Sequence, residues 1–310
     1  QIAVFRHQSS QQPPNIEVDL SFTSMDEVRG FRPQAAVIAN PASHHLDMAL
    51  TLARQGVHLL VEKPISIKAT PGVLELIRIC KEQDLALMTG YNLRFLPSLN
   101  VFRDLLLQNK AGKVFSIRAE VGQYLPSWRP DSDYRQTVSA QKKLGGGILL
   151  ELSHEIHYLQ WLFGRVDWVK AHVARHSDLE IDVEDTAYLL LGFKPNDYGQ
   201  QLVASLNMDF IRHDITRQCL VIGDEGTLRW NGIEGKVDFF SLSENKWEEL
   251  YSEQPERDLT YQKEIMHFVS CVENGEAPNV TGEDGLAALV VVDAARKSSL
   301  EGRVIIPEDM

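Results

Sequence analysis

The chain has 310 residues, a length that predicts about two domains with buried cores and excludes a disulfide-stapled mini-protein. Hydrophobic residues make up 44% and charged residues 24%, so neither wholesale disorder nor a fibrous repeat is expected. The 31 basic and 43 acidic residues give a net charge of −12, which opposes non-specific binding to nucleic acid. No apolar run approaches the roughly 18 residues of a membrane span. We therefore expect a small molecule as partner, with no nucleic acid and no membrane.

The three cysteines, Cys80, Cys219 and Cys271, are odd in number, far apart and set in apolar sequence. This usage predicts buried free thiols in a reducing cytoplasm, not disulfides or metal ligands. The sequence also lacks a pair of histidines with a carboxylate at zinc-binding spacing, a G-x-S-x-G elbow and a Walker A loop. We therefore expect no metal, and neither hydrolase nor nucleotide-kinase chemistry.

Residues 1–95 alternate between strand and helix signals. A strand-like stretch opens the chain, and Ser24 with Glu27 has the spacing of a capping box before a short helix. Further strands are predicted at residues 35–39, 57–61 and 85–88, and helices begin near His45 and at Thr70-Pro71. Strands that alternate with helices of about a dozen residues predict parallel βαβ units in a doubly wound sheet.

A second domain is predicted over residues 96–310, where strands follow one another directly and antiparallel pairing in an open sheet is expected. Val203, Leu206 and Met208 suggest an apolar sheet face, which we expect to support a homodimer or homotetramer. The segment 125–143 is long enough to be a functional loop. The predicted elements are a helix at 99–108, strands at 114–121, 166–173, 186–193, 201–208, 218–222 and 227–230, and helices at 260–273 and 282–299.

A lysine follows one of the predicted buried strands. Glu62-Lys63-Pro64 comes directly after the strand that ends at Val61, and ligands of doubly wound sheets bind beyond the carboxyl ends of the strands. Pro64 biases Lys63 toward an extended conformation, which fixes the direction in which the ammonium can reach. Lys63 is therefore predicted to face a ligand, although a solvated surface lysine would give the same tripeptide.

A triple glycine, residues 145–147, precedes an amphipathic helical segment. Glu151 lies one turn before His154, which suits a general acid/base histidine that a carboxylate orients. A helix packed on the second domain's sheet, with a hydrogen-bonded core histidine, explains the pattern equally well. The predicted buried face holds Leu149, Leu152, Ile156, Leu159 and Phe163, and the opposite face holds Glu151, His154, Tyr158 and Trp161.

Four motifs, taken together, resemble one protein family. They are Ala39-Asn40-Pro41-Ala42-Ser43-His44-His45, Val61-Glu62-Lys63-Pro64, Gly90-Tyr91-Asn92-Leu93-Arg94-Phe95 and the triple-glycine helix with His154. In order and spacing the chain is similar to the Gfo/Idh/MocA oxidoreductases, the glucose-fructose oxidoreductase and inositol dehydrogenase superfamily. The resemblance spans nearly the whole chain. Residues 128–161 look most like members that act in sugar and nucleotide-sugar metabolism for surface polysaccharides.

The resemblance implies a Rossmann domain that binds a nicotinamide dinucleotide and an α/β domain with an open, mostly antiparallel sheet. It implies hydride transfer at a hydroxyl carbon of a sugar, sugar derivative or nucleotide sugar, with Lys63 and His154 catalytic and Glu151 a further candidate. The expected cofactor-binding residues are Arg6, His7, Asn40, Pro41, His45, Glu62, Lys63 and Asn92. The expected substrate-binding residues are Arg94, Trp128, Arg129 and Tyr134, whose arginine and aromatic groups suit such ligands, and His157.

Three departures from the family pattern carry expectations of their own. The chain opens at what resembles the family's second strand, without the glycine-rich phosphate loop, so either residues are left off the N-terminus or a natural fragment holds cofactor poorly. An Asp commonly lies four residues before the histidine, whereas Glu151 lies three before His154, which weakens its orienting role. An Asp commonly follows by three positions, where this chain has His157, so activity is altered or lost if that acid holds substrate or proton.

The end of the first strand predicts the cofactor. NAD-selective sites place an acid there to bind the ribose 2′-hydroxyl, whereas an arginine accommodates a 2′-phosphate. Phe5 is followed by Arg6 and His7, with no acid, which favours NADP and leaves NAD as the alternative. Two other hypotheses stay open: a non-catalytic relative that binds a sugar ligand or a protein partner, and lyase chemistry by transient oxidation with tightly held NAD.

Overall fold

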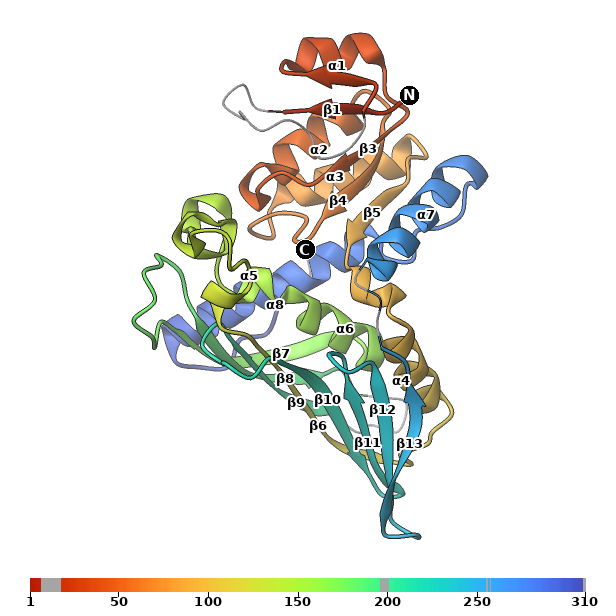
Figure 1. Cartoon of the computed structure of the whole chain (residues 1–310), viewed down its shortest axis with the longest axis vertical. Helices are drawn as coiled ribbons and strands as arrows, with labels where there is room; N and C mark the ends of the chain where they lie inside the picture. The colour runs from red at the N-terminus through yellow and green to blue at the C-terminus, as the bar shows by residue number, and fades with distance from the viewer. Residues whose placement is uncertain (7–17, 196–200, 255, 257, 309–310) are drawn as a thin grey trace.

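The computed structural model describes residues 1–6, 18–195, 201–254, 256 and 258–308, so His7 lies outside the described residues. The chain forms a smaller part built on parallel strands and a larger part built on one wide sheet (Figure 1). In the smaller part β1 (Ala3–Phe5) pairs in parallel with β2 (Leu20–Phe22), and β3 (Ala35–Ile38), β4 (His58–Glu62) and β5 (Leu87–Gly90) form a parallel three-stranded sheet.

Three helices connect the strands of the smaller part: α1 (Met25–Phe31), α2 (His45–Ala53) and α3 (Pro71–Glu82). The predicted capping box is confirmed, because Ser24 Oγ accepts from the Glu27 N–H and the Glu27 carboxylate accepts from the Ser24 N–H. Pro71 occupies the first turn of α3, where its missing N–H has no helical partner to lose. The alternation of strands and helices predicted for this part is confirmed.

The larger part is an eight-stranded sheet with the order β13-β12-β11-β10-β6-β9-β8-β7. Among the described strands of this sheet only β6 and β9 pair in parallel, so the predicted, mostly antiparallel sheet is confirmed. The sequence prediction lacks β12 and β13, although Val237 and Phe239 alternate toward the core along β12. The strands are β6 (Val114–Gly122), β7 (Val166–Ala174), β8 (Thr186–Phe193), β9 (Val203–Asp209), β10 (Thr216–Gly223), β11 (Gly226–Asn231), β12 (Lys236–Ser241) and β13 (Lys246–Ser252).

Helices cover one face of this sheet and join it to the smaller part (Figure 1). The long helix α8 packs on β7 and α6 and also contacts β5, so it lies between the two parts. The segment before α8 continues the smaller sheet, because the Thr89 N–H donates to the Val280 carbonyl at 3.1 Å. The helices are α4 (Pro97–Leu107), α5 (Ile148–Glu151), α6 (Ser153–Phe163), α7 (Leu259–Asn274) and α8 (Gly282–Glu301).

The predicted apolar face of the sheet is partly wrong. Leu206 and Met208 are buried under the helices, whereas Val203 lies on the open face with the exposed side chains of Tyr188 and Leu190. Strand alternation sends side chains two residues apart to the same face, so Val203 cannot share a face with the other two. All three cysteines are buried, as predicted. Among the described helices, none is long and apolar enough to cross a membrane.

Candidate active site

Lys63 lies where the smaller part meets the triple-glycine helix. It follows the last residue of β4, and its Nζ donates to the Glu151 carbonyl oxygen at 2.7 Å, 88 residues further along the chain. The position is the carboxyl end of a parallel strand, as the sequence predicts. The ammonium is partly buried at the junction of the two parts, so its reach is restricted to the space next to α5 and α6.

His45 contacts the backbone of the loop that contains Lys63. Its Nδ1 lies 2.8 Å from the Pro64 carbonyl oxygen and its Nε2 lies 2.7 Å from the Asn40 carbonyl oxygen, across the ends of β4 and β3. His45 is buried, and burial lowers the pKa of its imidazole. Both ring nitrogens therefore contact the protein backbone, so His45 positions the ends of the two strands. The expected direct contact of His45 with a cofactor stays a prediction.

A break between α5 and α6 makes the carbonyl that Lys63 binds available. In a continuous helix the Glu155 N–H would donate to the Glu151 carbonyl. Here it donates to the Leu152 carbonyl, so the Glu151 carbonyl is left to accept from Lys63. The glycines before α5 allow close packing there: a Cβ on Gly146 would lie 2.2 Å from the Val138 carbonyl oxygen, and Gly147 begins the helix with φ of 104°. The triple glycine thus sets where the broken helix starts.

His154, in the first turn of α6, is half-buried, and its Nδ1 is buried without a hydrogen-bond partner. The ring meets the Tyr91 ring edge-on, with centroids 5.4 Å apart. Burial, followed by the positive charges of Lys63 and Arg217 and the nearby His157, lowers the pKa of His154 well below its usual value. The imidazole is therefore neutral at physiological pH, the form that can accept a proton.

The contacts of Glu151 differ from the sequence expectation. Its carboxylate accepts from Ser139 Oγ at 2.9 Å, and its carbonyl binds Lys63. No hydrogen bond joins the carboxylate to His154, whose Nδ1 has no partner in the described part of the chain. The break at Leu152 separates Glu151, at the end of α5, from His154, in the first turn of α6. The structure therefore brings Lys63 and His154 together through the backbone of Glu151.

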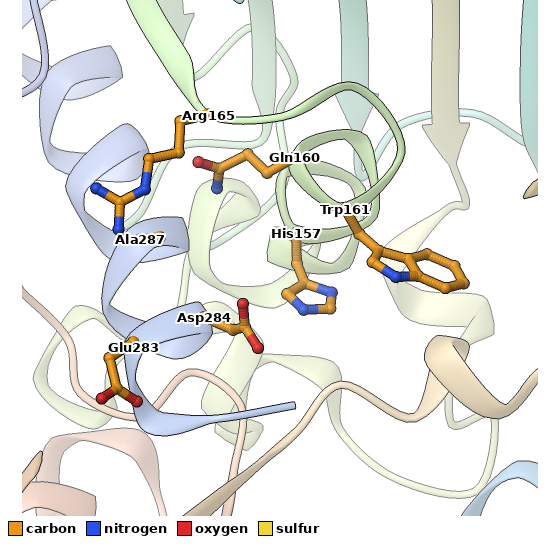
Figure 2. A pocket seen from close by; sticks show the side chains of 7 residues that line it. All are labelled: His157, Gln160, Trp161, Arg165, Glu283, Asp284 and Ala287. Carbon is orange, nitrogen blue, oxygen red and sulfur yellow. The ribbon is translucent and has the colours of Figure 1, made fainter. Parts of the chain in front are cut away.

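His157 is buried against Tyr91. Its ring stacks on Tyr91 with centroids 4.1 Å apart and planes 5° apart, so the Tyr91 ring lies against both histidines. Burial, with a smaller effect of the Arg94 charge, lowers the pKa of His157 to about 3. Figure 2 shows the cavity of about 120 Å³ that His157 lines with Gln160, Trp161, Arg165, Glu283, Asp284 and Ala287, between α6 and the start of α8.

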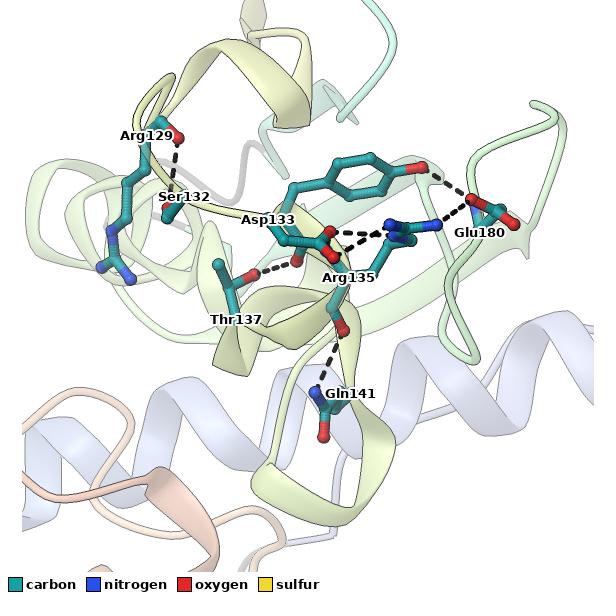
Figure 3. A network of polar contacts seen from close by, with 8 residues as sticks. Arg129, Ser132, Asp133, Arg135, Thr137, Gln141 and Glu180 are labelled. Atoms are coloured by element: carbon teal, nitrogen blue, oxygen red, sulfur yellow. Dashed lines mark hydrogen bonds and ion pairs between the residues drawn. The ribbon is translucent and has the colours of Figure 1, made fainter. Parts of the chain in front are cut away.

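The remaining predicted substrate residues contact their own surroundings. Trp128 Nε1 donates to the Gln123 carbonyl at 3.1 Å, and the Tyr134 hydroxyl accepts from the Glu180 N–H at 3.2 Å. Arg129 is exposed on the turn-rich loop between β6 and α5 (Figure 3). The 3₁₀ turns of this loop are η3 (Leu125–Ser127), η4 (Tyr134–Gln136), η5 (Val138–Ala140) and η6 (Lys142–Leu144). The Arg94 guanidinium stacks over the Trp161 ring, with its Cζ 4.1 Å from the ring centroid. None of these contacts joins the four side chains to Lys63 or His154, so their contact with substrate stays a prediction.

Several polar groups at the ends of β3 and β4 are suited to a bound ligand. Asn40 Oδ1 and Ser43 Oγ are buried without a partner among the described residues, beyond the end of β3. Glu62 ends β4, and burial is the main cause that raises the pKa of its carboxyl. Asn92 donates to Thr260 Oγ1 at 3.0 Å, so its amide nitrogen contacts α7. Unpartnered acceptors at the carboxyl ends of parallel strands fit the hydroxyl groups of a dinucleotide.

Two further acidic residues, which the sequence does not single out, lie close to this region. Glu155 is fully buried and pairs with Arg217 of β10, and Glu264 of α7 is 1% exposed with an unpartnered Oε1. Burial and the nearby Glu62 raise the pKa of Glu264 to about 8. Glu155 could have been found from the sequence, because it directly follows His154. Arg217 and Glu264 are distant from His154 in sequence, so no local pattern indicates them.

We expect Glu264→Gln to remove part of the pH dependence of stability. The pKa rises from its usual 4.5 to about 8 on folding, so the carboxyl's contribution is fully present below pH 4.5 and is lost as the pH rises through 8. In urea unfolding at pH 5, 7 and 9, the variant should gain on the order of 4 kcal/mol relative to wild type between pH 5 and pH 9, as proton linkage gives for this shift. Exposed Glu273→Gln on the same helix is the control. Parallel curves for wild type and Glu264→Gln would contradict the assignment.

Comparison with known proteins places the chain in a family. The profile described as "Oxidoreductase family, NAD-binding Rossmann fold" matches residues 3–91, and "Oxidoreductase family, C-terminal alpha/beta domain" matches residues 103–306. A relative, myo-inositol 2-dehydrogenase from Thermotoga maritima, is 26% identical over 285 residues, which cover 89% of this chain and 80% of the relative.

Solved structures show the same fold. A levoglucosan dehydrogenase in complex with NADH has a TM-score of 0.82 at 18% identity, covering 94% of this chain and 85% of that one. The WlbA dehydrogenase from Bordetella pertussis, in complex with NADH and UDP-GlcNAcA, has a TM-score of 0.74 at 21% identity, covering 93% and 84%. Because the two family profiles together match most of the chain, this protein belongs to the Gfo/Idh/MocA family of oxidoreductases, with an NAD-binding Rossmann domain followed by a C-terminal α/β domain.

Proposed function

We propose that this protein is an NAD(P)-dependent dehydrogenase or reductase that acts on a hydroxyl carbon of a sugar, a sugar derivative or a nucleotide sugar. The observation that carries the proposal is the Lys63 ammonium, fixed on the Glu151 carbonyl beside a half-buried His154 whose pKa is lowered. Relatives named as inositol and sugar dehydrogenases support this substrate class.

The two side chains divide the proton chemistry of alcohol oxidation. Loss of a hydride from an alcohol carbon requires loss of the hydroxyl proton, which a neutral His154 imidazole can accept. The Lys63 ammonium stabilises negative charge on the substrate oxygen as that proton leaves. The nicotinamide cofactor, when bound, accepts or supplies the hydride. Tyr91 packs against the His154 ring and keeps water from that side, because it is itself fully buried.

The cofactor is proposed to lie along the ends of β1, β3 and β4, and to be NADP. Asn40, Ser43 and Glu62 offer polar groups there, with Pro41 and Lys63 in the same loops. Arg6 directly follows β1, the position where an arginine accommodates a 2′-phosphate. NAD is the alternative, and the NADH complexes of structural relatives keep it open.

Fluorescence titration with NADPH and NADH tests this proposal, with the protein expressed from its complete reading frame. We expect NADPH to bind more tightly, and Arg6→Gln to weaken NADPH binding by about 10-fold or more, since a charged hydrogen bond contributes roughly 1.5–3 kcal/mol. NADH binding should change little, and exposed Arg29→Gln on α1 is the control. Equal loss for both cofactors would contradict the Arg6 assignment. Binding of neither cofactor would favour the non-catalytic relative that binds a sugar ligand or a protein partner, which His157 in place of an acid also suggests.

The proposal also covers the oligomeric state of the protein, the boundary between its two domains and its cellular compartment. The exposed Tyr188, Leu190 and Val203 on the open face of the large sheet support a homodimer or homotetramer. The profile ranges 3–91 and 103–306 support a domain division between residues 95 and 96. Three buried free cysteines support a reducing cytoplasm.

A further inference from the structure

Arg217 enters the candidate active site from the large sheet. It lies near the start of β10, on the helix-covered face of the strand, since it shares its side with the buried Cys219 and Val221. Its Nε donates to Glu155 Oε1 at 2.7 Å, across 62 residues of sequence. Glu155 directly follows His154 in α6, so the pair ties the sheet to the helix that presents the imidazole.

The geometry of the pair is unusual for a purely stabilising contact. The Glu155 side chain is 0% exposed and its Oε2 has no partner, whereas the Arg217 side chain keeps 22% of its surface exposed. Burying a carboxylate with one partner costs about as much as the ion pair returns, so such a pair is weak evidence for stability. Its clear effect is directional, because the bond to Nε fixes the plane of the guanidinium.

The other edge of the guanidinium is available. Within the described residues, the two Nη atoms of Arg217 make no hydrogen bond. The Arg217 side chain is partly exposed, and neither Nη atom is among the fully buried unpartnered atoms. Lys63, in contrast, already donates to Glu151. The positive charge of Arg217 lies close enough to His154 to lower the pKa of the imidazole, as does that of Lys63, so cations from both parts of the chain act on His154.

Other charged groups near Arg217 do not cancel it on the open side. Burial is the main cause that raises the pKa of the Tyr261 phenol on α7. The charges of Glu62 and Glu264 raise this pKa further, and the charge of Arg217 lowers it. Glu264 has a pKa raised to about 8, so it is largely neutral at physiological pH. Glu155 is bound on the Nε side of the guanidinium. The free edge of the Arg217 guanidinium is therefore suited to attract an anion.

We propose that the substrate carries a carboxylate, as a sugar acid does, and that the Nη edge of Arg217 binds it while Glu155 holds the guanidinium in place. A planar guanidinium edge matches the two oxygens of a carboxylate. The proposal rests on the proposed function, since it names the substrate class of the same site. It makes Arg217 a substrate-binding residue and Glu155 a positioning residue.

The test compares sugars that differ only in a carboxylate. D-glucose is paired with D-glucuronate, and UDP-N-acetylglucosamine with UDP-GlcNAcA. For cofactor-loaded wild type we expect the acid to exceed the neutral sugar in kcat/KM by about 10-fold or more in at least one pair, the size expected of a charged hydrogen bond. In Arg217→Gln that ratio should fall by about 10–100-fold. Arg217→Lys, which keeps charge without the planar edge, should fall between the two.

Two controls separate binding from folding. Glu155→Gln/Arg217→Gln removes both charges, so no buried carboxylate is left unpaired, and it should lose the acid preference while melting near the wild-type temperature. Arg229→Gln breaks a different arginine–carboxylate pair of the same sheet, with Asp238, and should keep the preference. Preference for the neutral sugar in both pairs, or an equal loss for acid and neutral sugars in Arg217→Gln, would overturn the inference.

A binding readout distinguishes this inference from the proposed function. Calorimetric titration of the cofactor-loaded protein with each sugar reports the acid preference even where turnover is slow. If cofactor binds and neutral sugars are oxidised without any acid preference, the dehydrogenase assignment stands and the carboxylate assignment fails. If no cofactor binds and no sugar is turned over, the proposed function fails. Tighter calorimetric binding of the acid that Arg217→Gln abolishes would still support the role of Arg217.

Discussion

Lys63→Met should lower kcat by about 10²–10⁴-fold, the range observed when a positioned acid/base or charge-stabilising group is removed. The variant keeps the length and apolar stem of the side chain but removes the ammonium that donates to the Glu151 carbonyl at 2.7 Å. Steady-state kinetics with the preferred cofactor and sugar measure the loss. Cofactor affinity, measured by fluorescence titration, should change much less than kcat, because the ammonium acts on the reacting oxygen.

Lys68→Met is the matched control for this prediction. Lys68 is exposed in the same loop and makes no hydrogen bond among the described residues, so its variant should keep wild-type kinetics. A Lys63→Met enzyme with near wild-type kcat and raised KM would mean that Lys63 only binds ligand, and the role in stabilising the substrate oxygen would have to be withdrawn.

His154→Asn should lower kcat/KM by about 10²–10⁴-fold, because an amide cannot accept the hydroxyl proton. The change should flatten the pH profile as well as lower it. Exposed His172→Asn on β7 is the control, since it lies on the open face of the sheet. If the loss were the same at every pH between 5 and 9 and the wild-type profile had no acid limb, His154 would be structural and the alternative of a packed core histidine would hold.

The position of the acid limb tests the electrostatics around His154. Burial, Lys63, Arg217 and His157 lower the pKa of the imidazole, so the neutral base persists as the pH falls below 6.5 and wild-type kcat/KM should decline only at lower pH. Arg217→Gln removes one nearby positive charge, so the limb should move to higher pH. A limb at the same pH in both proteins would show that Arg217 lies too far away to act on His154.

Much of this fold is determined by local sequence. The capping box at Ser24, the strand before Lys63 and the strands at 166–174 and 186–193 follow from periodicity and turn residues, so they were predictable within a few residues. Lys63 and His154 could be assigned to one site from the sequence, because each lies within a short motif that resembles the family. Local patterns also failed where a strand is mostly exposed, as β13 shows.

Only the tertiary structure decided what these residues contact. The sequence places Glu151 one turn from His154, but the break at Leu152 directs its carboxylate to Ser139 and its carbonyl to Lys63. Likewise, the contact between Glu155 and Arg217 joins residues 62 positions apart on different elements.

Sequence alone therefore indicated the family, most of the elements in their order and the two residues, Lys63 and His154, that are proposed for the site. The three-dimensional fold decided which ring stacks on which histidine, which carbonyl the lysine binds and which arginine flanks the imidazole. The physical reason is that secondary structure depends on side chains a few residues apart, whereas hydrogen bonds, ring contacts and pKa shifts depend on distances of a few ångströms between segments that only folding brings together.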